Sequence, residues 1–308
     1  MQNQDKLIWS LHHGLRSDPR RAFSFGVTVD GTKLRVWFGC RIALFNFPSI
    51  DWLEVCRQRL ISIPFLIFSL QSPDLLIKFF IFLAFSKESE LGFDTQIERV
   101  NYSDFQLHFL IQGTDYLTSR VLYDVGADAM CGRGTWVFEA YPQGQVNPMP
   151  CVIKDCWVEN RDGKEMEHVL VEKVRAAIGR DKFCEYFVDV CGYRRSENEA
   201  LNRFCSLLSD GQFDVQRNTR ILSGDGKVNH SATYSQLGQA FVDGQEPHLQ
   251  LDPGVTQPGR PHLRFRYQIV YAERGTSLYD ITSLSATFGY LVQVTDGTKL
   301  DIVVRGNS

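Results

Sequence analysis

Two glycines and one lysine are the residues of this chain whose types and spacing could hold a phosphate group. Gly132 and Gly134 form a turn that leads into an apolar stretch, residues 135–140. A turn without side chains lets backbone N–H groups approach an anion closely. Lys154 ends the apolar run of residues 151–153, which places a positive charge on an otherwise buried strand. Together these residues predict contacts with the phosphates of a nucleotide.

Each of these residues also has a plainer interpretation. A Gly-x-Gly pair marks any tight turn, including an ordinary hairpin. In the nucleotide-binding pattern G-x-G-x-x-G-x-V, Val137 stands where the third glycine would fall, unless Val137 is itself the valine that covers the base. Lys154 could be a strand-end lysine whose ammonium group reaches water. Alternation along the strand puts Val152 on the same face as Lys154, where it would line an apolar slot for the base.

The helix expected at residues 164–178 supplies a carboxylate for Lys154. At 3.6 residues per turn, Glu167 shares a face with the apolar residues Leu170, Val171, Val174 and Ile178. Glu165 and Glu172 lie on the more polar side of the helix. We therefore predict that Glu167 pairs with Lys154. The alternative is a solvated glutamate that is favoured in the first turn by the helix dipole.

Composition limits the class of protein. The chain has 308 residues, 44% of them hydrophobic and 22% charged, and a formal net charge of −3. These values are those of an ordinary globular protein and give no electrostatic case for binding nucleic acid or an anionic membrane. The eight cysteines lack metal-ligand spacing and predict free thiols in a reducing, intracellular compartment. The histidines predict no metal site either, and no Walker A pattern is present.

Local patterns predict a mixed α+β fold. Residues 23–45 have the alternation of a β-hairpin, with a type I′ turn at Asp30-Gly31. Ser72 and Pro73 predict the start of a buried helix that runs to about residue 85. Further along, we expect β-rich residues 116–158, a helix that ends before Gly179, a strand at residues 263–272 and a last helix at residues 284–294.

Residues 55–71 interrupt this pattern with an apolar insert. Val55-Cys56 can be encoded by GTATGT and Gln71 by CAG, the usual ends of a short intron, and the insert keeps the reading frame. A retained intron is therefore one interpretation, and a genuine buried helix or strand is the other. The apolar runs at residues 60–70 and 75–85 are each well short of the ~20 residues needed to span a membrane, so no membrane role is expected.

The segments described so far resemble the fungal-type protein kinases, a divergent kinase-like family. The resemblance covers most of residues 18–299, except for the insert and the loop after residue 210. Its strongest part is the succession from GRGT to VIKDCW. The segments that carry it are, in order, residues 21–28 (RAFSFGVT), 34–38 (LRVWF), 90–94 (ELGFD), 132–140 (GRGTWVFEA), 152–157 (VIKDCW) and 266–270 (RYQIV).

This resemblance implies roles for individual residues. Members of the family transfer the γ-phosphate of ATP to protein Ser or Thr hydroxyls with the help of Mg²⁺. By the resemblance, Lys154 would contact the phosphates, and Glu167 would be its partner on the helix. Glu273 would begin a hinge, residues 273–276, whose backbone meets the adenine. The nucleotide would be covered by Gly132, Gly134, Val137 and Val152.

The resemblance also implies an organisation. An α+β accessory region at residues 1–115 would precede a kinase-like N-terminal lobe at residues 116–308. That lobe would be an antiparallel sheet with one αC-type helix and a long loop at residues 209–262, and the second lobe would be largely missing. The H-R-D and D-F-G motifs, which supply the base and the metal ligands, occur nowhere in the sequence.

We therefore expect a kinase-family chain that is incomplete and inactive, with no catalytic residue and no metal ligand of its own. ATP and Mg²⁺ are expected as cofactors of the family. The alternative is a non-catalytic module that binds a nucleotide or a protein partner. A protein substrate or partner would be consistent with either interpretation, whereas nucleic acid and membranes are not expected.

Overall fold

The structure is a computed structural model, and it describes residues 2–51, 73–101, 106–128, 130–161, 163–196, 198, 201–202, 219–220 and 263–275. The apolar insert at residues 55–71, nearly all of the loop at residues 209–262 and the last helix expected at residues 284–294 lie outside the described residues.

The chain folds into two compact units, and it passes between them more than once. The first unit takes the described residues of Met1–Thr95, Ala127–Gly134 and Asn198–Leu263. The second takes those of Gln96–Gly126, Thr135–Glu197 and Arg264–Ser308. The boundary expected between residues 115 and 116 falls inside strand β7 (Thr114–Tyr123). The two strands before β7 in the sequence belong to the same sheet. The two units are described separately below.

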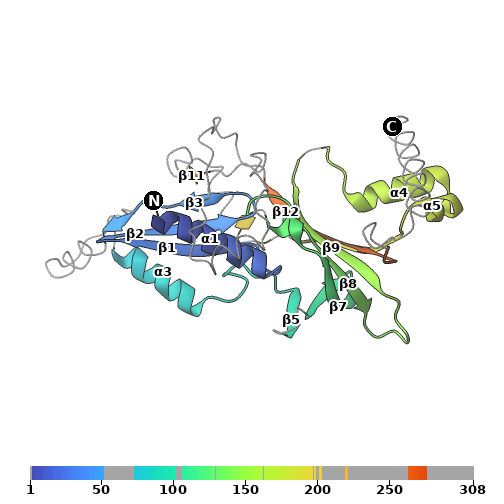
Figure 1. The fold of residues 1–308 in the computed structure, drawn as a ribbon, viewed down its shortest axis with the longest axis horizontal. Coiled ribbons are helices and arrows are strands. Elements are labelled where there is room, and N and C mark those ends of the chain that lie inside the picture. The colour runs from blue at the N-terminus through green and yellow to red at the C-terminus, as the bar shows by residue number, and fades with distance from the viewer. Residues whose placement is uncertain are drawn as a thin grey trace, which may run out of the picture. The chain divides into compact units, whose positions relative to one another are not determined.

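The first unit is a small antiparallel sheet with the strand order β1-β2-β3-β11, and β4 pairs with β2 (Figure 1). The elements of this unit are α1 (Gln2–Ser17), β1 (Phe23–Asp30), β2 (Lys33–Cys40), β3 (Leu44–Asn46), β4 (Ile50–Asp51), α3 (Pro73–Phe85) and β11 (Thr219–Arg220).

Alternation along β1 sends its side chains to two helices. On one face, a Cβ at Gly26 would lie 2.6 Å from Leu7 of α1, so the glycine permits a close helix–sheet contact. On the other face, the Phe25 ring contacts the rings of Phe79 and Phe82 on α3 at centroid distances of 5.8 and 5.7 Å. The sheet is therefore covered by α1 on one side and by α3 on the other.

The expected hairpin is present as β1 and β2, but its turn differs from the expectation. The register pairs Asp30 with Lys33, so Gly31 and Thr32 are the two central residues. Gly31 has a φ of +56°, whereas Thr32 is not among the residues with positive φ. A type I′ turn requires positive φ at both central residues, and the predicted turn type was therefore wrong.

The second unit is a seven-stranded antiparallel sheet in the order β10-β12-β9-β8-β7-β6-β5 (Figure 1). The strands not yet given are β5 (Ile97–Asn101), β6 (Gln106–Ile111), β8 (Trp136–Pro142), β9 (Cys151–Glu159), β10 (Val190–Ser196) and β12 (Arg264–Tyr271); the helices are the 3₁₀ turn η1 (Val125–Ala127), α4 (Glu167–Ile178) and α5 (Arg180–Tyr186).

The strands and the helix predicted for this part of the chain are confirmed, with shifted boundaries. The helix begins at Glu167 rather than at residue 164, and it ends at Ile178, directly before Gly179, whose φ is +81°. β9 continues to Glu159, so Lys154 lies inside the strand and not at its end. The interpretation of Lys154 as a strand-end lysine is therefore wrong.

The core of the second unit contains a buried ion pair between neighbouring strands. Nε of Arg266 donates to Oδ1 of Asp155 at 2.8 Å, and the two side chains are only 2% and 4% exposed. The opposite face of the sheet carries an apolar cluster made of Cys156, Val158, Phe265, Tyr267 and Ile269. Met166, which directly precedes α4, packs against this cluster, so the helix begins over that face.

No helix in the described part of the chain combines the length and the apolar composition needed to cross a membrane.

Candidate functional site

An ion pair joins the middle of β9 to the start of α4. Nζ of Lys154 lies 2.7 Å from Oε2 and 3.0 Å from Oε1 of Glu167, so the ammonium group contacts both carboxylate oxygens. The lysine side chain is 24% exposed and the glutamate side chain 37%. The partner predicted for Lys154 from helical periodicity is thus the partner in the structure, and Glu165 instead pairs with Lys173.

The register of the sheet places two predicted site valines around Lys154. Val137 on β8 is directly opposite Lys154 across the strands, and Val152 is two residues away on β9. Residues at opposite positions and two apart share one face of a sheet, so the three side chains lie on the same face. Both valines are half-buried. The face that carries the ammonium group therefore also presents an apolar surface beside it.

Two tyrosines of β12 contact the first residues of α4. The Tyr271 hydroxyl donates a hydrogen bond to Oε1 of Glu167. The Tyr267 hydroxyl lies 3.3 Å from the backbone N of His168 and 2.9 Å from its Nδ1. Burial, together with the charge of Glu167, raises the pKa of both tyrosines, so both hydroxyls remain protonated near neutral pH.

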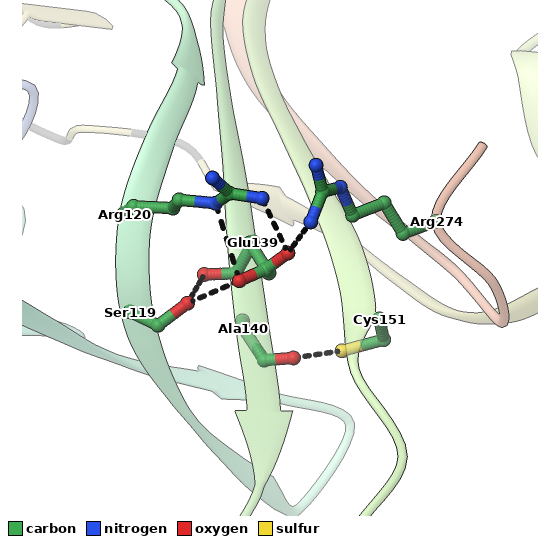
Figure 2. A network of polar contacts seen from close by, with 6 residues as sticks. All are labelled: Ser119, Arg120, Glu139, Ala140, Cys151 and Arg274. Carbon is green, nitrogen blue, oxygen red and sulfur yellow. Dashed lines mark hydrogen bonds and ion pairs between the residues drawn. The ribbon is translucent and has the colours of Figure 1, made fainter. Parts of the chain in front are cut away.

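Glu139 on β8 is a buried carboxylate that contacts three donors (Figure 2), and the strand register places it on the face that carries Lys154. Glu139 is 7% exposed. Its Oε1 accepts from Oγ of Ser119 at 2.9 Å and lies 3.3 Å from Nε of Arg120, and its Oε2 accepts from Arg274 at 2.6 Å. Burial alone would raise the pKa of Glu139, but the three donors outweigh burial and lower it. Glu139 is therefore ionised and ties β7 and the segment after β12 to β8.

The two glycines of the predicted phosphate turn belong to the first unit. The N–H of Gly132 donates to the carbonyl oxygen of Arg41 at 2.9 Å. Gly134 has a φ of +49°, and a Cβ there would lie 2.8 Å from the guanidinium carbon of Arg41. Arg41 is buried and donates to the carbonyl oxygens of Leu15 and Ala127. Within the first unit, Gly134 is required by the close approach of Arg41, and the contact of either glycine with a phosphate stays a prediction.

The last predicted site residue, Glu273, follows β12 and is exposed. Its neighbour Arg274 makes the contact with Glu139, and Tyr271 makes the contact with Glu167. The sequence analysis missed Tyr271 and Glu139. A signal for Glu139 was present, because a charged residue two positions from Val137 in an apolar strand must share its face.

Among the residues that the structure describes, no group of three or more His, Cys, Asp or Glu side chains is arranged to hold a metal ion. The cysteines Cys40, Cys131, Cys151, Cys156, Cys184 and Cys191 are free thiols.

The second unit is thus an α+β unit in which a lysine–glutamate pair joins a central strand of an antiparallel sheet to the helix that follows, an arrangement compatible with a kinase-like fold. The model of the fungal protein kinase family matches residues 1–296, so this chain belongs to that family. No curated protein matches the chain. No solved structure matches it either.

Proposed function

We propose that the second unit is the phosphate-holding part of an ATP site, in which Lys154 contacts the α- and β-phosphates. The Lys154–Glu167 ion pair carries this proposal. In protein kinases, the lysine that contacts the phosphates lies on the third strand and pairs with a glutamate of the following helix, and activity requires the pair.

The order of elements supports the same proposal. The connection that contains Gly132 and Gly134 joins β7 to β8, and β9 follows. When β7 is counted as the first strand, Lys154 therefore lies on the third. The helix that supplies Glu167 comes directly after β9. This succession of glycine connection, lysine strand and glutamate helix is that of a kinase N-terminal lobe.

The apolar surface beside Lys154 is proposed to hold the base. Val137 and Val152 are half-buried and share the face of Lys154, so an adenine stacked on them would direct its phosphates toward the ammonium group. Glu273, directly after β12, would begin the hinge whose backbone groups meet the edge of the adenine. The valines provide shape and apolar contact, whereas Lys154 provides charge.

ATP and Mg²⁺, the cofactors expected for the family, fit the described residues to different degrees. The paired ammonium group of Lys154 suits a phosphate oxygen. The described residues offer no metal-binding group of three, and the proposal therefore assigns no ligand to Mg²⁺. Mg²⁺ would supply charge neutralisation of the phosphates when it is bound.

We further propose that these 308 residues bind a nucleotide without transferring its phosphate. Phosphoryl transfer needs an Asp that orients the attacking hydroxyl and an Asp and Asn that hold the metal, and the H-R-D and D-F-G motifs that supply them are absent from the sequence. The same absence favours the second candidate function, a non-catalytic module of the kinase family. Substrate specificity for Ser or Thr is expected from the family alone.

Titration with a fluorescent, non-hydrolysable ATP analogue tests the binding proposal. Lys154→Met should weaken binding by about tenfold or more, because a hydrogen bond to a charged group is worth about 1.5–3 kcal/mol. Lys182→Met is the matched control, since Lys182 is an exposed lysine on α5 of the same unit. Equal affinity of Lys154→Met and the unchanged chain, or no binding by the unchanged chain, would overturn the proposal.

A further inference from the structure

We propose that Tyr271 and Tyr267 are positioning residues, which hold α4 where Glu167 meets Lys154, so that the sheet itself assembles the pair. The inference rests on the function proposed above for Lys154. It concerns how the site is regulated. In protein kinases, the position of this helix is a control point, and the lysine–glutamate pair forms only when the helix is moved into place.

The spacing of the two tyrosines matches the start of the helix. Tyr267 and Tyr271 are four residues apart on β12, so their side chains lie on the same face of the sheet. Glu167 and His168 are the first two residues of α4. Tyr271 bonds the first of them and Tyr267 the second, so β12 fixes two successive residues of one helix end.

Tyr267 replaces a helix cap that the local sequence does not provide. The first N–H groups of a helix lack partners within the helix, and a Ser, Thr, Asp or Asn at the N-cap normally accepts from one of them. The N-cap residue of α4 is Met166, which makes no side-chain cap hydrogen bond. The Tyr267 hydroxyl accepts from the N–H of His168 and can donate to Nδ1 of the same residue. The start of α4 is thus capped by β12.

The His168 ring adds a second attachment to the sheet. It stacks on the ring of Tyr193 on β10 at a centroid distance of 3.5 Å and an interplanar angle of 14°. Tyr193 contributes its ring to this contact, whereas Tyr267 contributes both a ring, at a centroid distance of 5.9 Å, and its hydroxyl. This difference makes Tyr193→Phe a control that keeps the ring and removes a hydroxyl.

Tyr271 acts on the ion pair directly. Its hydroxyl donates to Oε1 of Glu167, and Nζ of Lys154 contacts both Oε1 and Oε2. A second donor restricts the rotation of the carboxylate and keeps both oxygens toward β9 and β12. Lys154 and Tyr271, both of the second unit, thus hold Glu167, and Lys154 is oriented before a nucleotide arrives.

The experiment uses the full chain with Tyr271→Phe, Tyr267→Phe and Tyr193→Phe, and it has one readout that needs no nucleotide. Amide hydrogen exchange at His168 should accelerate about fivefold in Tyr267→Phe, as expected for the loss of one hydrogen bond, and should stay unchanged in Tyr193→Phe. The ¹⁵N signal of the Lys154 ammonium group, assigned through Lys154→Met, should shift in Tyr271→Phe and not in Tyr193→Phe. Unchanged exchange in Tyr267→Phe, or an unchanged lysine signal in Tyr271→Phe, would overturn the inference.

The second readout separates positioning from a general loss of structure. Tyr271→Phe should weaken the binding of a non-hydrolysable ATP analogue about fivefold. The affinity for adenosine, which has no phosphates, should stay unchanged. In the Lys154→Met background the same substitution should have no effect. Equal losses for the analogue and adenosine, or a loss that persists without Lys154, would overturn the inference. If the unchanged chain binds neither compound, the proposed function fails, and the exchange and lysine readouts still decide the inference.

Discussion

Arg274 and Glu139 form an ion pair that links the segment after β12 to β8, with Nη1 of the arginine 2.6 Å from Oε2 of the glutamate. Glu139 shares the sheet face of Lys154 and is directly opposite Val152. The pair therefore fixes the end of β12 beside the apolar surface that we propose for the base. Arg120 and Ser119 contact the same carboxylate from β7 (Figure 2).

We expect Glu139→Gln to lower the free energy of unfolding by about 2 kcal/mol, because hydrogen bonds to a charged group are lost. The loss is moderate because Arg120 and Arg274 are partly exposed, so water screens their charges. Urea denaturation measures the change. Glu98→Gln, which alters an exposed glutamate on β5, is the matched control and should stay within about 0.5 kcal/mol. Equal effects of the two substitutions would show that the Glu139 network contributes little.

The buried Asp155–Arg266 pair leads to a different expectation. Arg266→Met should cost about 3–5 kcal/mol, because it leaves the carboxylate of Asp155 buried without its partner. The double variant Arg266→Met/Asp155→Leu should recover most of that loss, since it removes both charges. Denaturation of Arg266→Met, Asp155→Leu and the double variant gives the coupling free energy between the two side chains. A double variant as unstable as the sum of the single losses would contradict this account.

Which contacts of the site could be predicted depends on how far apart the two residues lie in the sequence. The Lys154–Glu167 pair could be predicted because the strand and the helix are close in sequence and each has a clear periodicity. The contacts of Tyr267 and Tyr271 with α4 could not, because β12 is far from α4 in the sequence and only the sheet register brings them together. Periodicity assigns each residue of β12 to a face of the sheet, but it does not say which residues of a distant helix that face meets.

The fold shows the same limit. The hairpin of β1 and β2 and the strands β8, β9 and β12 have local alternation that predicts them. Local patterns do not show where the two units divide, because Ala127–Gly134 belongs to the first unit although the segments on both sides of it belong to the second. Met130 and Cys131 pack there against Leu11 and Trp37, a contact between distant segments that no local pattern reveals.

The stability of the first unit should fall as the pH drops below about 6.5. Burial lowers the pKa of His12, and the positive charges of Arg41 and Arg16 lower it further. Between that lowered pKa and the ordinary value, the unfolded chain binds more protons than the folded chain, so acid favours unfolding. Burial also lowers the pKa of His168 in the second unit, so protonation of His168 in acid favours unfolding as well.

Denaturation at about pH 7.5 and 5.5 tests this sign. The difference in unfolding free energy between the two pH values should shrink in His12→Gln. The neighbouring His13 is exposed, and His13→Gln should leave the difference unchanged. A pH dependence that is the same in both variants would remove His12 as its source.

We expect no phosphoryl transfer to protein substrates by the purified 308-residue chain, because the base and the metal ligands of kinase chemistry are absent from its sequence. An assay with radiolabelled ATP measures transfer, with Lys154→Met as the control for contaminating kinases. Reproducible transfer that Lys154→Met abolishes would show that this chain supplies the missing groups in another way.

The most direct test of the central claim observes the Lys154 ammonium group while a nucleotide binds. In ¹⁵N spectra of the lysine side chains, with the signal assigned through Lys154→Met, a non-hydrolysable ATP analogue should shift the Lys154 signal, and adenosine should shift it far less. That result would place the triphosphate against the ion pair formed with Glu167. A Lys154 signal that stays in place while the analogue saturates the chain, or the absence of any binding, would contradict the account.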